Sequence, residues 1–451
     1  MNRKKSLRHY ICVICCLLMA MQQITGHAQE PGAEELYAQA AVLMDADSGR
    51  VLYDKNGSQV LAMASTTKIM TCILTLELAE LQETVEISSY AASMPKVKLY
   101  VQKGEKYRLE DLLYSLMLES HNDAAVAIAE HVGRKYLPPE LAEKSPADYT
   151  VEESKQAVAA FAAQMNRKAA EIGCRDTWFI TPNGLDATQT LTLESGETIE
   201  KSHSTTARDL ASIMCYCIRR SPQKETFLKI TQTPSYSFSI DNGRSFSCAN
   251  HNAFLQMMQG AISGKTGFTN QAGYCYVGAL ERDGKTLVVA LLACGWPNNK
   301  SYKWSDTRLL MNYGLEEFTY HSLDEVAYEE SQLKQIPVLR GQTMAIGETA
   351  YVPVRILERD AGGEYDQTDP VTGEALEGVT GLLLKEGEAF SVECHIESRL
   401  QAPVAAGAQV GTIQYIFQNQ VYREEHIVTT KAVQKIDYRW CFQQILQYFL
   451  L

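Results

Sequence analysis

Residues 65–76 read STTKIMTCILTL, and this stretch decides which fold we expect. Its apolar residues follow the i, i+3, i+4, i+7 spacing of a helix with one buried face, at Ile69, Cys72, Ile73 and Leu76. Ser65 and Lys68 open this helix, where residues three apart lie on the same side. A serine hydroxyl attacks a carbonyl only after a base removes its proton, and a lysine with a lowered pKa is such a base. The pair therefore indicates a nucleophile with its own base.

The Ser-x-x-Lys pattern is not specific by itself, because it occurs four times in the chain, at Ser65, Ser93, Ser221 and Ser331. The patterns at Ser93 and Ser221 contain a proline, and Ser331 lies where a β-rich region is expected to begin. Only Ser65 begins a strongly amphipathic helix, so Ser65 is the candidate nucleophile.

Two further motifs follow along the chain. Ser120-His121-Asn122 is the only Ser-x-Asn in the sequence, and it comes after an apolar spacing that predicts a helix over residues 109–117. Lys265-Thr266-Gly267 is the only Lys-Thr-Gly, and it lies in a strand-like stretch at residues 261–268. The order Ser-x-x-Lys, Ser-x-Asn, Lys-Thr-Gly is that of serine penicillin-recognising enzymes.

The chain has 451 residues, about twice what one hydrophobic core supports, so we expect two domains and terminal segments. Near the N-terminus, basic residues precede an apolar run, 10–21, which is too short to cross a bilayer. Gly26-His27-Ala28 then offers the small residues that a signal peptidase reads. These features predict a secretory signal peptide over residues 1–28; the alternative is an uncleaved N-terminal anchor.

Residues 29–320 are predicted to form the catalytic domain, of the α+β class, with an antiparallel sheet flanked by helices. A hairpin is expected around Asp47-Ser48-Gly49. The other expected elements are helices over 109–117, 123–129, 150–171 and 305–313, and strands over 261–268, 274–280 and 286–294. We expect Asp123 to cap the second of these helices and Gly314 to end the last.

The remaining chain is expected to form a small β-rich domain and a terminal helix. Short alternating segments indicate an all-β domain over residues 325–430, with strands at 349–354, 391–396 and 412–417. Residues 432–451 have a helical pattern with Tyr438, Phe442, Ile445 and Phe449 on one face. This face suits a membrane interface; the alternative is a helix packed on the β domain.

Charge and cysteine content exclude some classes of protein. The formal net charge of −12 makes nucleic acid an unsuitable partner. Three of the twelve cysteines lie in the predicted signal peptide, and the other nine are scattered through apolar stretches, which indicates buried thiols rather than a disulfide framework. The cysteines and histidines show no metal-ligand spacing, so no metal is expected.

The chain resembles the serine D-alanyl-D-alanine carboxypeptidases, the low-molecular-mass penicillin-binding proteins. Beyond the three motifs, the resemblance rests on residues 41–53, 120–125, 181–186, 204–210, 264–269, and 402–404 with Gly407 and Gly411. It implies a penicillin-binding, β-lactamase-like transpeptidase fold followed by a small all-β domain. The stretch 134–156 is longer than in the simplest members of the family.

The resemblance also implies residue roles. Ser65 would be the acylated nucleophile and Lys68 its general base. Ser120 would pass a proton toward the leaving amine. Asn122 would position the substrate amide and support hydrolysis of the acyl-enzyme. His121 occupies a variable position of the motif, and we expect no catalytic role for it.

On the Lys-Thr-Gly side, Lys265 would keep the local field positive and so help hold the base neutral. Thr266 would bind the terminal carboxylate of the substrate. Gly267 and Phe268 continue the substrate-binding strand, and the Phe268 N–H would complete an oxyanion hole with the N–H of the nucleophilic serine. Lys303 stands where the family usually has an arginine, which keeps the charge but loses the planar fork that grips a carboxylate.

The expected function is removal of the terminal D-alanine from peptidoglycan stem pentapeptides, without a metal or organic cofactor. β-Lactam antibiotics are expected to acylate the same serine. The enzyme would be exported and held on the outer face of the cytoplasmic membrane by its C-terminal helix. Two alternatives are a β-lactamase, although the chain lacks an ExxLN loop between the second and third motifs, and a non-catalytic peptidoglycan-binding or sensor module, although its motif residues are intact.

Overall fold

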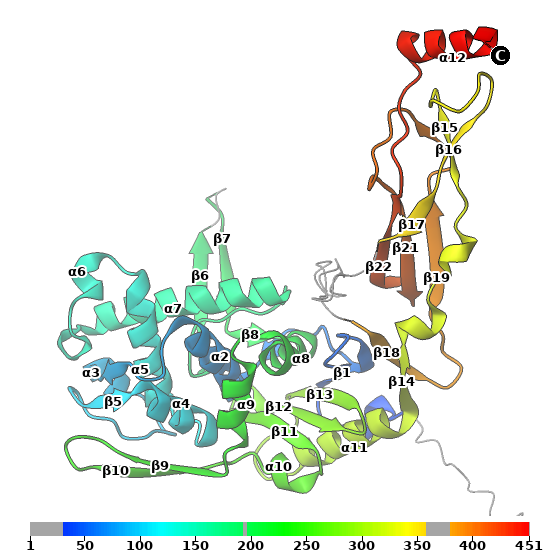
Figure 1. The fold of residues 1–451 in the computed structure, drawn as a ribbon. Helices are drawn as coiled ribbons and strands as arrows, with labels where there is room; N and C mark the ends of the chain where they lie inside the picture. Colours follow the sequence, from blue (N-terminus) through cyan, green and yellow to red (C-terminus); the bar gives the residue numbers. More distant parts are fainter. Residues whose placement is uncertain (1–29, 193–195, 358–378, 451) are drawn as a thin grey trace, which may run out of the picture.

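The structure, a computed structural model, describes residues 30–192, 196–357 and 379–450. The predicted signal peptide lies outside the described residues. Of those residues, the first three hundred form helices around a central sheet, and the last hundred form a β-rich part that extends away from them (Figure 1). The expected α+β fold, with an antiparallel sheet, flanking helices and an added β domain, is confirmed.

The central sheet has five antiparallel strands in the order β11-β12-β13-β1-β2. Their bounds are Ala261–Thr269, Gly273–Arg282, Lys285–Leu292, Ala40–Asp45 and Val51–Lys55. The predicted hairpin is β1 and β2, and Gly49 in its turn has a φ of 72°, which glycine adopts without strain. Strand β11, which carries Lys-Thr-Gly, is an edge strand of this sheet.

Both faces of the sheet are covered, because alternate residues of a strand point to opposite faces. In β13, Val288, Ala290 and Leu292 enter one hydrophobic core, which the sheet shares with most of the helices. Leu287, Val289 and Leu291 enter a second core, beneath α11 (Tyr302–Glu317). The sheet is therefore the middle layer of three.

The helix containing Ile69 is α2 (Lys68–Leu78), and it is buried along most of its length. The other helices of this part are α3 (Ser89–Ala92), α4 (Leu109–Leu118), α5 (Asn122–Gly133), α6 (Pro139–Ala142), α7 (Val151–Ile172), α8 (Ala207–Cys215), α9 (Lys224–Gln232) and α10 (Phe254–Met257). Helix α7 begins with the capping box that the sequence indicates, between Thr150 and Glu153.

Four short strand pairs complete this part of the chain. They are β3 (Leu61–Ala62) with β8 (Ser204–Thr205), β4 (Thr84–Glu86) with β5 (Lys106–Arg108), β6 (Thr188–Thr192) with β7 (Thr198–Ser202), and β9 (Ser235–Ser239) with β10 (Ser245–Ala249).

Two expectations about helix ends are wrong. Gly314 does not end the last helix, since α11 continues to Glu317. A Cβ at Gly314 would lie 2.8 Å from side-chain carbons of Leu43 and Leu287, so the glycine instead lets α11 pack closely on the sheet. Asp123 is not the N-cap of α5, because this helix begins one residue earlier, at Asn122. The Asp123 carboxylate instead accepts hydrogen bonds from a neighbouring loop.

The β-rich part begins where β14 (Phe318–Ser322) leaves α11 and pairs with β18 (Gly381–Lys385). Beyond this pair lie the sheets β16-β15-β20 and β17-β22-β21-β19. Their strands are β15 (Ile336–Leu339), β16 (Ala350–Val352), β17 (Val354–Ile356), β19 (Ser391–Ile396), β20 (Leu400–Gln401), β21 (Gln409–Phe417) and β22 (Gln420–Thr429). The terminal helix, α12 (Tyr438–Leu450), lies at the end farthest from the catalytic part (Figure 1).

Candidate active site

The candidate nucleophile and base are neighbours in the structure. Ser65 lies in the short 3-10 turn η2 (Ala64–Thr67), and Lys68 is the first residue of α2, so one turn brings both side chains to the same side. The Lys68 Nζ lies 2.8 Å from the Ser65 Oγ and 3.0 Å from the Asn122 Oδ1, and it also bonds to the carbonyl oxygen of Asn183.

This set of partners suits an uncharged amine. Lys68 is fully buried, and burial, together with the charge of Lys265, holds its pKa well below the usual range, although Asp123 opposes the shift. A neutral amine has two N–H donors and one lone pair. Two carbonyl-type oxygens, on Asn122 and Asn183, can take the two protons, which leaves the lone pair facing the Ser65 hydroxyl. The geometry can therefore hold a general base against its nucleophile.

The Ser-x-Asn and Lys-Thr-Gly motifs meet across the site. The Lys265 Nζ lies 3.0 Å from the Ser120 Oγ and 2.9 Å from the Thr266 carbonyl oxygen. Ser120 has a φ of 65°, an uncommon conformation for a residue with a side chain, at the turn between α4 and α5. Burial lowers the pKa of Lys265 to about 7, so its charge depends on pH near neutrality.

Two glycines allow the backbone to close around Ser65. A Cβ at Gly267 would lie 2.8 Å from the Ser65 backbone nitrogen, so only glycine lets β11 approach η2 this closely. Gly184 has a φ of 83°, and a Cβ there would lie 1.9 Å from the Ala64 carbonyl oxygen. Phe268, the residue after Gly267 in β11, is 38% exposed.

Lys303 is separate from this group. Its Nζ bonds at 2.6 Å to the Lys300 carbonyl oxygen and lies over the rings of Tyr274 and Trp304, at 4.7 and 4.8 Å from their centroids. Burial, followed by the charge of Lys300, lowers its pKa to about 8. Within the described residues, hydrogen bonds thus join Lys68 to Ser65 and Asn122, and join Lys265 to Ser120. Lys303 has partners of its own.

Some residues around the site were not singled out from the sequence as site residues. The Asn183 carbonyl bonds to Lys68. In the sequence, Asn183 lies in the stretch Thr181-Pro182-Asn183-Gly184, which resembles the family, and nothing else marks it as a site residue. His203 is buried behind η2, where its Nδ1 accepts the Ile180 N–H at 3.0 Å and its Nε2 lies 2.8 Å from the Thr67 Oγ1. Burial, aided by Lys68, lowers the pKa of His203 to about 3, so the ring is neutral.

His121 bonds to a residue of α4. Its Nδ1 lies 2.7 Å from the Ser115 hydroxyl, and burial lowers its pKa. Among the described residues, no group of three or more His, Cys, Asp or Glu side chains is arranged to hold a metal ion. All nine described cysteines are thiols, and seven of them are buried.

The fold and this arrangement of serine, lysine, asparagine and a second lysine define a class, the penicillin-recognising proteins. The family model described as D-alanyl-D-alanine carboxypeptidase matches residues 25–135 and 153–294. The model of the penicillin-binding protein 5 C-terminal domain matches residues 379–435. The chain therefore belongs to the D-alanyl-D-alanine carboxypeptidase family of serine peptidases. The match is interrupted at 136–152, in the stretch that was expected to be longer than usual.

Individual relatives agree with the family. The D-alanyl-D-alanine carboxypeptidase DacF of Bacillus subtilis is 24% identical over 407 residues, 89% of this chain and 87% of the relative. DacB2 of Mycobacterium tuberculosis, also a D-alanyl-D-alanine carboxypeptidase, is 32% identical over 278 residues, 61% of this chain and 82% of the relative. The crystal structure of penicillin-binding protein 5 from Haemophilus influenzae has the same fold, with a TM-score of 0.60 over 89% of this chain and 98% of that one, at 20% identity.

Proposed function

We propose that the protein is a serine D-alanyl-D-alanine carboxypeptidase that removes the terminal D-alanine from peptidoglycan stem pentapeptides. The observation that carries this proposal is the contact between Ser65 and a buried Lys68 whose pKa is lowered. The lysine lone pair takes the hydroxyl proton while the Ser65 Oγ attacks the carbonyl of the penultimate residue. The scissile C–N bond then breaks, and the proton that Lys68 took passes through Ser120 to the leaving amine of D-alanine, which leaves Lys68 neutral again.

Hydrolysis of the acyl-enzyme completes the reaction. A water molecule loses a proton to Lys68 and attacks the ester carbonyl, which releases the shortened peptide and restores the Ser65 hydroxyl. Asn122 supports this step because its amide holds the base at 3.0 Å. The Ser65 and Phe268 N–H groups stabilise the oxyanion in both steps, and the close approach permitted by Gly267 brings η2 and β11 together.

Recognition of the substrate requires a site for its free carboxylate. In this proposal the Thr266 hydroxyl donates a hydrogen bond to this carboxylate. Lys265, whose buried Nζ bonds to the Thr266 carbonyl oxygen, adds a positive field at the edge of β11. Lys303, whose Nζ lies over the ring of Tyr274 in β12, contributes charge but not the two parallel hydrogen bonds of an arginine. The strained amide of a β-lactam has the same carboxylate and reaches the same serine.

We also propose that the enzyme is exported and held on the outer face of the cytoplasmic membrane. Within the described residues, no helix is long and apolar enough to cross a membrane. The apolar face of α12 is instead open, with Tyr438 96%, Phe442 64% and Phe449 82% exposed. Met344 and Ile346 are exposed on the loop between β15 and β16, beside the chain that leads into α12. These side chains could enter the interfacial region of a bilayer.

The test is mass spectrometry of the protein after treatment with penicillin, together with D-alanine release from diacetyl-Lys-D-Ala-D-Ala. We expect one penicilloyl adduct on Ser65, no adduct on Ser65→Ala, and slow turnover of the adduct. Ser331→Ala is the matched control, because it changes another Ser-x-x-Lys serine, exposed in the β-rich part. Full labelling of Ser65→Ala would show that Ser65 is not the nucleophile. Turnover of many penicillins per second indicates a β-lactamase, and labelling without D-alanine release contradicts the carboxypeptidase.

A further inference from the structure

The loop at residues 95–105, called here the wall loop, borders the Ser-x-Asn motif. Its backbone holds Asn122 on two sides: the Val97 carbonyl accepts the Asn122 N–H at 2.8 Å, and the carbonyls of Pro95 and Lys96 lie 3.3 and 3.2 Å from its Nδ2. The other end of this amide, Oδ1, faces Lys68. The wall loop therefore sets the orientation of the amide that holds the base.

The wall loop is itself held from inside by Asp123. The two carboxylate oxygens of Asp123 accept the N–H groups of Leu99, Tyr100 and Val101 at 2.8, 2.8 and 3.2 Å. Tyr100 has a φ of 64°, a conformation that a bulky residue keeps only where its surroundings impose it. These bonds explain why Asp123 serves the loop instead of capping α5.

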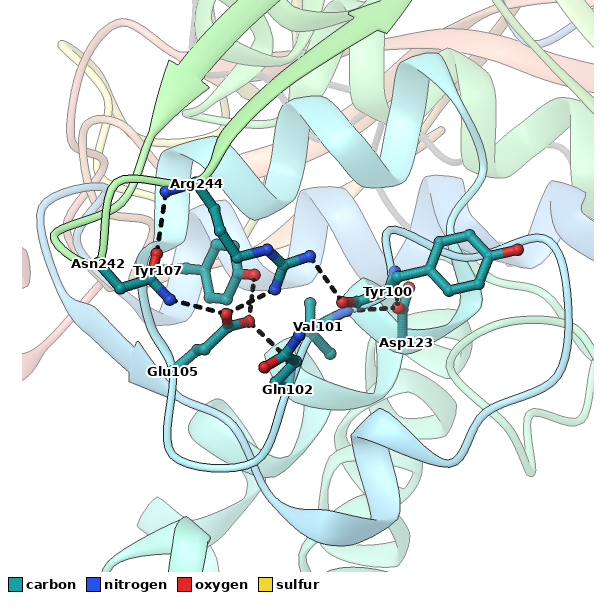
Figure 2. Close-up of polar contacts among 8 residues, drawn as sticks. All are labelled: Tyr100, Val101, Gln102, Glu105, Tyr107, Asp123, Asn242 and Arg244. Atoms are coloured by element: carbon teal, nitrogen blue, oxygen red, sulfur yellow. Dashed lines mark hydrogen bonds and ion pairs between the residues drawn. The ribbon is translucent and has the colours of Figure 1, made fainter.

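A second support comes from the hairpin formed by β9 and β10, about 140 residues further along the chain. Arg244 reaches from this hairpin to the wall loop, with its Nη1 at 2.5 Å from the Glu105 Oε1 and its Nη2 at 3.0 Å from the Tyr100 carbonyl oxygen (Figure 2). Asn242, at the tip of the hairpin, donates to the same Glu105 oxygen at 2.9 Å. One guanidinium thus bonds to the loop at two points, each through a different nitrogen atom of its rigid fork.

Glu105 is the centre of this support. Its other oxygen accepts the Tyr107 hydroxyl and the Gln102 N–H, each at 2.7 Å (Figure 2). Its side chain is only 7% exposed, so the bond to Arg244 is poorly screened by water. Burial raises the pKa of Glu105, but the bonds from Arg244, Tyr107 and Asn242 outweigh burial and leave the pKa below its usual value.

The other end of the hairpin, at the end of β10, is bonded to the residue that precedes the Ser-x-Asn motif. The Ala249 N–H at the end of β10 donates to the Glu119 Oε1 at 2.7 Å, one residue before Ser120. The rings of Phe238 and Phe246, on the same face of the hairpin, pack against Tyr107 at 6.3 and 5.8 Å between centroids. The hairpin therefore bridges Glu119, next to the Ser-x-Asn motif, and the wall loop as a packed unit.

We propose that Arg244 is a positioning residue, which acts through Glu105 and the Tyr100 carbonyl on the wall loop, and through that loop on the amide of Asn122. This inference rests on the proposed carboxypeptidase function. Arg244 acts on the orientation of the base and not on the carboxylate-binding group at Thr266. Its loss should therefore lower kcat and leave KM nearly unchanged.

The experiment compares Arg244→Ala with Arg219→Ala and Arg244→Lys. Arg219 is a matched control, because its side chain is 32% exposed against 31% for Arg244, and its ion pairs are with Asp47 and Glu281, outside the site. We expect Arg244→Ala to lower kcat for diacetyl-Lys-D-Ala-D-Ala by about 10-fold, with KM changed less than about 2-fold. Arg244→Lys should recover part of this loss, and Arg219→Ala should match wild type.

Hydrogen exchange provides a readout that does not depend on activity. The amides of residues 99–102 should exchange faster in Arg244→Ala than in wild type, while α2 should exchange as before. Equal exchange in Arg244→Ala and Arg219→Ala overturns the proposal, and so does faster exchange with an unchanged kcat. The proposal is also overturned if kcat falls only in proportion to the fraction of folded protein, as measured by thermal unfolding. If wild type releases no D-alanine, the proposed function fails, and the exchange data still decide whether Arg244 holds the loop.

Discussion

Replacement of Gly267 by alanine should abolish most of the acylation of Ser65 without unfolding the protein. The added Cβ would lie 2.8 Å from the Ser65 nitrogen, 3.0 Å from the Ala64 Cβ and 3.1 Å from the Thr66 nitrogen. Ordinary contacts of a Cβ begin at 3.4 Å, so β11 and η2 must separate by about 0.6 Å. The atoms in the way are backbone or Cβ atoms, which cannot rotate aside.

This movement separates the N–H groups of Ser65 and Phe268, which form the proposed oxyanion hole. Loss of one such donor costs acyl-transfer enzymes about 100-fold or more in rate, which corresponds to about 2.7 kcal/mol of transition-state stabilisation. We therefore expect the second-order rate constant for acylation by a fluorescent penicillin to fall about 100-fold in Gly267→Ala. Stopped-flow fluorescence measures this constant directly.

The control is Gly284→Ala, in the turn between β12 and β13. Gly284 has a φ of 72° and no heavy atom within 4 Å of the added Cβ, so alanine there strains the backbone but touches nothing. Gly284→Ala should lose about 1 kcal/mol of stability and still acylate at the wild-type rate. If folded Gly267→Ala acylates within about 2-fold of wild type, the close approach of β11 is not needed for the oxyanion hole.

Three further predictions concern pH and the terminal helix. Because the pKa of Lys265 is about 7, its positive charge is lost as pH rises through neutrality. In steady-state assays, KM for the peptide should therefore increase above about pH 7. A peptide with an amidated C-terminus should show no such increase. His203 has a pKa of about 3 in the folded protein and about 6.5 in the unfolded chain. The unfolded chain therefore binds more protons between these pH values, and stability is lost as pH falls. Urea unfolding should show about 2 kcal/mol less stability from this group at pH 5 than at pH 7.5, and His203→Asn should lack this pH-dependent difference. Deletion of residues 432–451 should move the protein from membrane to soluble fractions on centrifugation, and an unchanged partition would contradict membrane association through α12.

Much of the fold follows from local patterns. The α2 helix, the β1 and β2 hairpin and the capping box at Thr150 depend on spacing and turn chemistry within a few residues, and each forms where the sequence indicates. Gly314 shows the limit of such reasoning. Glycine commonly ends a helix, but here it lies against Leu43 and Leu287, which are distant in sequence, and their packing decides its role.

The same limit applies to the site. The motifs identify Ser65, Lys68 and Lys265 because the chemistry needs those residue types in a recognisable order. Asp123 was expected to cap a helix, which is a local role, whereas its carboxylate bonds to three backbone N–H groups more than twenty residues earlier. A side chain that serves a distant loop has no local signature.

The sequence by itself therefore determined the family, the candidate nucleophile and base, and the order of the main elements, since all of these depend on residue type and short spacing. Only the tertiary structure decided how the pKa of Lys68 is lowered and which groups bond to its amine, because its burial and the partners Asn122 and Asn183 come from separate segments. It also decided that Lys303 has partners of its own and that Arg244 reaches the wall loop. Electrostatic environment and long-range contact arise only when distant parts of the chain pack together.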